Sequence, residues 1–116
     1  MNTLSPSSLA WIFLAVAGLL EVAWVIAMKF SDGFSKLPHT ALVLLLSGGS
    51  LFCLSRAIIQ IPIGTAYSVW TGIGAVGALV AGIIFFGESM SLSRAVFVAF
   101  VLVGVAGLKV TATSAV

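Results

Sequence analysis

Apolar and polar residues alternate along this chain in long blocks: four apolar stretches are separated by three short polar breaks. Each stretch is about 20 residues long, the length that a helix needs to cross a hydrocarbon core about 30 Å thick. The pattern predicts helices at approximately 8–29, 38–58, 64–86 and 92–109. Because the breaks are too short for crossover connections, successive helices are expected to run antiparallel.

Helix-end signals occur at the borders of these stretches. Ser7 or Ser8 is expected to cap the first helix, Pro38 to open the second, and Ser91 to cap the fourth. Between the first two helices, Asp32-Gly33 predicts a tight turn.

Composition agrees with the block pattern and excludes several classes of function. The chain is 61% hydrophobic and 7% charged, which is incompatible with a soluble domain and indicates a single all-α transmembrane domain over residues 1–116. The five basic residues are scattered, so no nucleic-acid partner is expected. The sequence has no metal-ligand cluster, no nucleophile–base pair and no phosphate loop, so neither an enzyme nor a cofactor is expected.

The basic residues are divided almost evenly between the two sides of the membrane. An even number of helices puts both termini on one side with Arg56 and Lys109, while Lys29, Lys36 and Arg94 lie on the other. The positive-inside rule needs a larger asymmetry to set one orientation clearly. Either the chain inserts in both orientations, or a bias of one charge decides. Two oppositely oriented copies would supply the inverted repeats that many transporters place around a central site.

Glu21 is the only charged residue between Leu9 and Met28. At about 1.5 Å per residue, it lies roughly 18 Å from Leu9 and roughly 12 Å from Lys29, well inside the bilayer. Because a low dielectric penalises an ionised carboxylate, such a group usually moves protons or binds a cation. The alternative is a structural polar contact.

Aromatic residues surround the expected position of Glu21. Trp24 follows it by one helical turn, and its π face and indole N–H suit an organic cation. On the third helix, Tyr67 and Trp70 lie one turn apart and could close the site, with Tyr67 donating a hydrogen bond to Glu21. For Trp24 and Tyr67 the alternative is an anchoring role at the membrane interface.

Small residues accompany this constellation. Ser50 is a candidate to orient Glu21, unless it bonds a carbonyl of its own helix instead. Gly18 is expected to let another backbone approach the carboxylate. Gly74 and Gly77 are expected to act as packing notches or as a hinge.

These residues lie in stretches that resemble the small multidrug resistance transporters over nearly the whole chain. The matching stretches are 17–24, 29–34, 62–77 and 107–109. Within that family, Trp24 after Glu21, the run Trp70-Thr71-Gly72-Ile73-Gly74 and the ending Gly107-Leu108-Lys109 resemble the guanidinium-exporter branch. Polyaromatic-drug exporters usually have an extra aromatic residue where this chain reads Ser47-Gly48-Gly49-Ser50.

The resemblance implies an antiparallel, dual-topology homodimer in a bacterial inner membrane that exchanges protons for guanidinium-type cations. It implies that Glu21 binds proton and substrate alternately, with Trp24, Ser50, Tyr67 and Trp70 around it. Three alternatives stay open: an exporter of quaternary ammonium or polyaromatic drug cations, a structural proton-carrying membrane subunit, and an assembly partner that needs a second, oppositely oriented protein.

Overall fold

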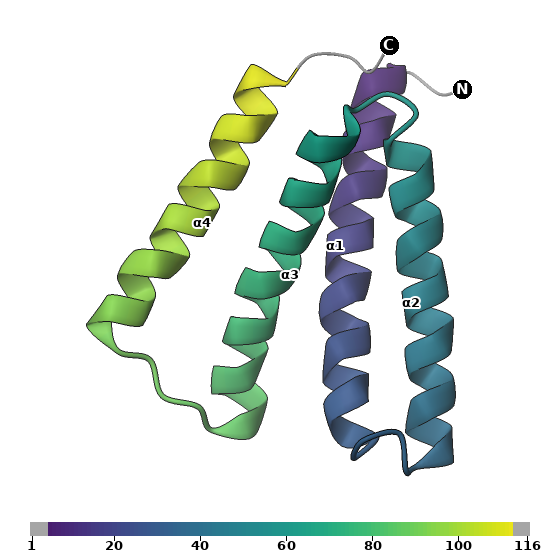
Figure 1. Cartoon of the computed structure of the whole chain (residues 1–116), viewed down its shortest axis with the longest axis vertical. Coiled ribbons are helices and arrows are strands. Elements are labelled where there is room, and N and C mark those ends of the chain that lie inside the picture. The colour runs from purple at the N-terminus through teal and green to yellow at the C-terminus, as the bar shows by residue number, and fades with distance from the viewer. Residues whose placement is uncertain (1–4, 113–116) are drawn as a thin grey trace.

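A computed structural model describes residues 5–112 of the chain. They form four helices and no strand, and the helices are α1 (Pro6–Phe30), α2 (Leu37–Ala57), α3 (Ile63–Phe86) and α4 (Leu92–Thr111) (Figure 1). Each helix is long and apolar enough to span a membrane. The predicted all-α architecture with four transmembrane helices is therefore confirmed.

Helix α1 is the centre of the arrangement. It packs along α2 and along α3, whereas α2 and α3 barely contact each other. The backbone of α4 packs against α3 alone, and α4 diverges from the other three helices toward the α3–α4 loop (Figure 1). At the end of the bundle where α1 begins and α4 ends, the Lys109 ammonium lies 5.0 Å from the centroid of the Trp11 ring. This cation–π contact joins α4 to α1.

Local capping explains where α1 and α4 begin, with one correction to the prediction. The cap of α1 is Ser5, not Ser7 or Ser8: the Ser5 hydroxyl accepts the N–H of Ser8 at 3.1 Å, and a proline follows directly in the first turn. The helix therefore starts earlier than predicted. Ser91 caps α4 as predicted, accepting the N–H of Arg94 at 3.3 Å.

The α1–α2 turn is tighter than an ordinary loop. Asp32, Gly33 and Phe34 have φ values of 52°, 68° and 66°, in the left-handed region that only glycine adopts freely. Ser31 holds the turn from inside: its fully buried hydroxyl donates to the Met28 carbonyl at 2.6 Å and accepts the N–H of Phe34 at 3.0 Å. The predicted turn at Asp32-Gly33 is confirmed.

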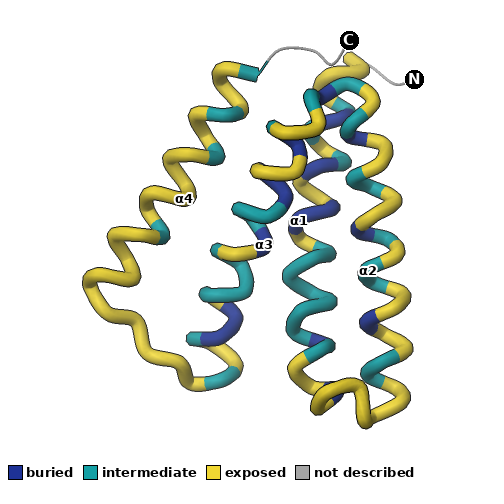
Figure 2. Tube along the Cα trace, viewed as in Figure 1, coloured by how far each residue is buried: buried dark blue, intermediate teal, exposed yellow. Residues whose placement is uncertain are grey.

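The cluster of buried residues that pack together lies in the half of the bundle where α1 and α3 begin, and Figure 2 shows buried stretches there and a further one near the end of α3. Its members come from α1, α2, α3 and the α2–α3 connection: Ala10, Leu14, Ala17, Ala57, Ile61, Ala66, Val69 and Trp70. In the other half of α1, residues 21–26 are only partly buried, and α4 has no buried residue. Glu21 thus lies where the packed core ends.

Two glycines allow α1 and α3 to approach closely. A Cβ added at Gly18 would overlap the side chain of Ile73, and one added at Gly77 would overlap Val22. Both glycines therefore act as packing notches here, the role small residues commonly have in membrane helix pairs. The helix is continuous through Gly74 and Gly77.

We predict that Gly77→Ala destabilises the bundle by about 1–3 kcal/mol, the usual cost of overpacking a close contact. Gly64→Ala is the matched control, because Gly64 lies on the same helix and a Cβ there meets nothing within 4 Å. Thermal unfolding in detergent should show a lower midpoint for Gly77→Ala only. Equal midpoints for the two variants would contradict this α1–α3 contact.

Candidate functional site

The Glu21 carboxylate lies between α1 and α3, directly against Gly74. A Cβ placed on Gly74 would overlap Oε1, Cδ and Cγ of Glu21, so the absence of a side chain there is what makes room for the carboxylate. Gly74 itself is buried. One turn further along α3, the notch at Gly77 is filled by Val22, the residue that directly follows Glu21 on α1. The sequence pointed to close packing at these glycines, and the structure identifies the acid as the group that Gly74 accommodates.

Two buried polar atoms in this region lack partners. Oε1 of Glu21 and Nε1 of Trp24 form no hydrogen bond with any residue that the structure describes. One is an acceptor and the other is a donor, and they belong to side chains one helical turn apart on α1. Buried polar groups are nearly always hydrogen-bonded in folded proteins, so these two atoms are exceptions within the described chain.

A hydrogen-bond network ties all three central helices together one turn from Glu21. Ser50 of α2 donates to the carbonyl oxygen of Ala17 at 2.7 Å. Trp70 of α3 donates through Nε1 to Ser50 Oγ at 3.0 Å and to the same carbonyl at 3.2 Å. Ser50 is 0% exposed and Trp70 is 9% exposed, so water does not compete for these bonds. In an α-helix the Ala17 carbonyl is also the acceptor of the Glu21 backbone N–H.

This network corrects the expectation for Ser50. The serine neither bonds Glu21 nor returns to a carbonyl of its own helix; it fastens α2 to α1. Its effect on Glu21 is indirect, because it holds the turn of α1 on which the acid stands. Sequence reasoning missed the Ala17 carbonyl because a backbone acceptor leaves no signal in the amino-acid sequence.

Tyr67 and Trp70 are neighbours with different environments. Their ring centroids are 5.7 Å apart, but Tyr67 is 56% exposed whereas Trp70 is buried. Tyr67 and Glu21 form no hydrogen bond with each other in the described chain, so the predicted donation to the acid is not made here. The exposed face of Tyr67 is available to another molecule.

The structure therefore divides the predicted site residues into two layers. Glu21 and Trp24 form one layer, with Gly74 beside the acid. Ser50 and Trp70 form the supporting layer on the core side, and Tyr67 stands at its edge. Across residues 5–112, no group of three His, Cys, Asp or Glu side chains could hold a metal ion.

Comparison with known protein families identifies the family of this chain. The family described as Small Multidrug Resistance protein matches residues 9–103, which include α1 from Leu9 onward and all of α2 and α3. The chain belongs to the small multidrug resistance family. The resemblance inferred from the stretches around Glu21 and Trp70 is confirmed.

Individual relatives in the family are similar over almost their whole length. A guanidinium exporter of Yersinia pestis is 50% identical over 101 residues, which are 87% of this chain and 97% of the relative. A guanidinium exporter of Salmonella typhimurium is 43% identical over 104 residues, 90% of this chain and 99% of the relative. A guanidinium exporter of Escherichia coli (strain K12) is 43% identical over 103 residues, 89% and 98% of the two chains.

We predict that Ser50→Ala destabilises this small multidrug resistance protein by about 1–2 kcal/mol, because it removes the bond to the Ala17 carbonyl and one of the two acceptors of Trp70 Nε1. The control is Ser47→Ala one turn earlier on α2, where the hydroxyl bonds only the Leu44 carbonyl of its own helix, at 3.2 Å. Denaturation in mixed micelles should separate the two variants. If Ser47→Ala were the more damaging change, the Ser50–Trp70 network would not be the fastening described here.

Proposed function

We propose that this chain is a proton-coupled antiporter of a bacterial inner membrane that exports guanidinium and related small guanidinyl cations. The observation that carries the proposal is the Glu21 carboxylate, held against Gly74 within a membrane-spanning helix with a buried oxygen that no described residue satisfies. The names of the relatives supply the substrate class. The protein is on this view a transporter and makes or breaks no covalent bond.

The chemistry of the acid suits a flat cation. Guanidinium presents N–H donors in a fork that matches the two oxygens of a carboxylate. Glu21 Oε1 can accept one of these hydrogen bonds, and the Trp24 ring one turn away offers a π face to the positive charge. A quaternary ammonium ion has no N–H and cannot satisfy the oxygen in this way. The unpartnered acceptor therefore favours guanidinyl cations over quaternary ammonium cations.

Exchange follows from competition for one group. A protonated Glu21 cannot form an ion pair with guanidinium, so the proton and the substrate bind alternately. The ionised, empty site carries an uncompensated charge inside the bilayer, and the cost of that charge opposes its return across the membrane. Each outward substrate step is thereby coupled to proton entry.

Access from alternate sides requires a second copy in the opposite orientation. One chain offers a single acid within its four helices, leaves Tyr67 exposed and leaves α4 without a buried residue. Two of its basic residues lie on the membrane side that holds both termini, and three lie on the other side. This near balance supports insertion of the chain in both orientations. We therefore propose an antiparallel homodimer whose halves swap conformation, with Trp24, Ser50, Tyr67 and Trp70 of the dimer around Glu21.

We predict that Glu21→Gln abolishes guanidinium-driven proton flux in proteoliposomes while the protein still assembles. The amide keeps the size of the side chain and removes both the charge and the titrating proton. Asp32→Asn is the control, since Asp32 lies in the α1–α2 turn and asparagine tolerates its φ of 52°. Coupled flux that persisted in Glu21→Gln would refute the assignment of Glu21, and tetraethylammonium in place of guanidinium tests the drug-cation alternative.

We also predict that the apparent Kd for guanidinium rises as pH falls. Only the ionised acid binds the cation, and the apparent Kd is the intrinsic value divided by the ionised fraction. The slope should approach about tenfold per pH unit once the protonated form dominates. Calorimetry of the purified protein across a pH series measures this slope. A Kd independent of pH would show that proton and cation bind at separate groups.

A further inference from the structure

A cavity of about 370 Å³ lies between α1 and α3 on the loop side of Glu21. Its inner end is lined by Val25, one helical turn after Glu21, and by Ala75, which directly follows Gly74. Its outer end is lined by Lys29, Gly82 and Glu88.

The cavity begins about one helical turn beyond the acid, which does not itself line it, and extends toward the α3–α4 loop. Helices α1 and α3 run in the same direction (Figure 1). An equal number of residues along each helix therefore covers the same distance along the bundle. Lys29 and Gly82 each follow the Glu21–Gly74 contact by eight residues, or about 12 Å of helix. The outer end therefore lies two turns from the acid, on the face of the membrane that carries the two loops.

Glu88 is folded back over the end of α3 at this outer end. Gly87 has a φ of 66° and reverses the chain, after which the Glu88 N–H donates to the Gly82 carbonyl at 3.1 Å. A Cβ on Gly82 would overlap both carboxylate oxygens of Glu88, so this glycine makes room for the second acid as Gly74 does for Glu21. The Glu88 carboxylate consequently borders the cavity.

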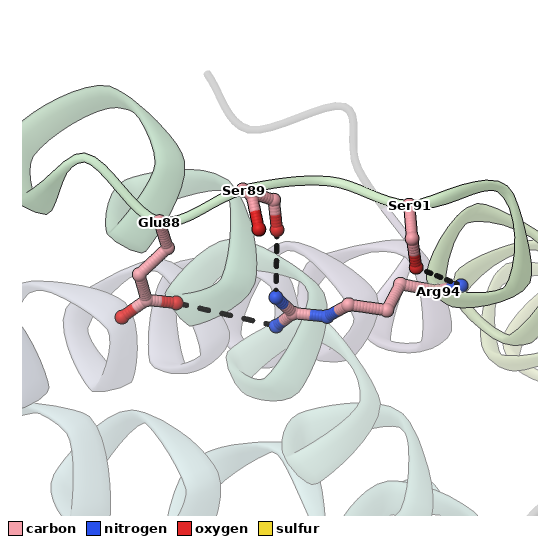
Figure 3. Close-up of polar contacts among 4 residues, drawn as sticks. All are labelled: Glu88, Ser89, Ser91 and Arg94. Carbon is pink, nitrogen blue, oxygen red and sulfur yellow. Dashed lines mark hydrogen bonds and ion pairs between the residues drawn. The ribbon is translucent and has the colours of Figure 1, made fainter.

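Arg94 is the only residue of the described chain that forms an ion pair with Glu88, and the pair is loose. Figure 3 shows the Arg94 side chain reaching back along the loop: Nη2 lies 4.0 Å from Glu88 Oε1, while Nη1 donates to the Ser89 carbonyl at 2.8 Å. The side chains are 42% and 49% exposed. A directly hydrogen-bonded arginine–carboxylate pair would be about 2.7–2.9 Å apart, so Arg94 leaves most of the acid's bonding capacity free.

We propose that Glu88 forms an outer cation-binding site at the mouth of this cavity, where guanidinium-type cations pause on their way to or from Glu21. The proposal rests on the proposed function and adds a second binding residue to it. Arg94 carries the same guanidinium group as the substrate class, and it pairs with Glu88 when no substrate cation is bound. Because an exposed ion pair contributes little free energy, an incoming cation can displace it.

Lys29 on the opposite wall keeps this outer site weak. Its ammonium lies 5.8 Å from the Phe86 ring centroid at the border of the same cavity, which adds a positive charge near the mouth. A cation held by Glu88 is therefore repelled by Lys29 and leaves readily. Weak, successive sites allow entry and release, as they do in ion pathways generally.

The test compares initial rates of guanidinium transport in proteoliposomes over a range of guanidinium chloride concentrations. Glu88→Gln should raise the KM about two- to fivefold, the range expected for losing one exposed charge contact. The maximal rate should stay the same, because Glu21 is intact. Asp32→Asn removes a carboxylate from the same membrane face that does not line this cavity but a neighbouring one, and it should leave the KM unchanged. The effect of Glu88→Gln should shrink at high salt.

Arg94→Gln gives the decisive second arm. This substitution removes the side chain that competes with the substrate for Glu88, so it should lower the KM. If the Glu88–Arg94 ion pair were only structural, both substitutions would impair transport alike. An unchanged KM in Glu88→Gln, or a raised KM in both variants, would overturn the outer site. If Glu88→Gln does not assemble, Arg94→Gln alone decides by the sign of its effect.

Failure of this inference is distinguishable from failure of the proposed function. If the wild-type protein carries guanidinium and Glu21→Gln does not, the function stands whatever Glu88→Gln shows. If the wild-type protein carries no guanidinium, the function and the outer site fall together.

Discussion

The close contact between α1 and α3 is the constraint on which the rest of this structure depends. Two membrane helices gain little from the hydrophobic effect against each other, so their association relies on packing and hydrogen bonds. Here Gly18 and Gly77 let the helices approach, and Gly74 turns that approach into a compartment for a carboxylate. The bonds of Ser50 and Trp70 to the Ala17 carbonyl then hold the adjoining turn of α1 in place. The acid is thus positioned next to a firm core on one side, and a cavity begins about one helical turn beyond it on the other.

Much of the fold could be predicted because its signals are local. Stretches of about 20 apolar residues define the helices without any tertiary information. The cap of α1 is Ser5 and not the predicted Ser7 or Ser8, and the local signal for it is Pro6, which favours the residue directly before it as the cap. The depth of Glu21 was equally plain, since a lone charge in an apolar run is conspicuous.

The partners of the site residues could not be predicted in the same way. A serine in a membrane helix has several acceptors within reach, and only the assembled bundle selects the Ala17 carbonyl for Ser50. Small residues along α3 indicated a close approach without indicating that Gly74 meets an acid and Gly82 meets another. The exposure of Tyr67 also depends on how three helices are placed, which no single helix encodes.

The isolation of α4 has a consequence for how this protein persists in a bilayer. This helix contacts α3 along its backbone and reaches α1 through Lys109 over Trp11, yet buries none of its own residues. In the homodimer proposed above, α4 gains further contacts from the second copy, and mass action makes that gain depend on how many copies the membrane holds. Dilution of the chain in lipid would therefore weaken the proposed dimer, even if each single chain stayed folded.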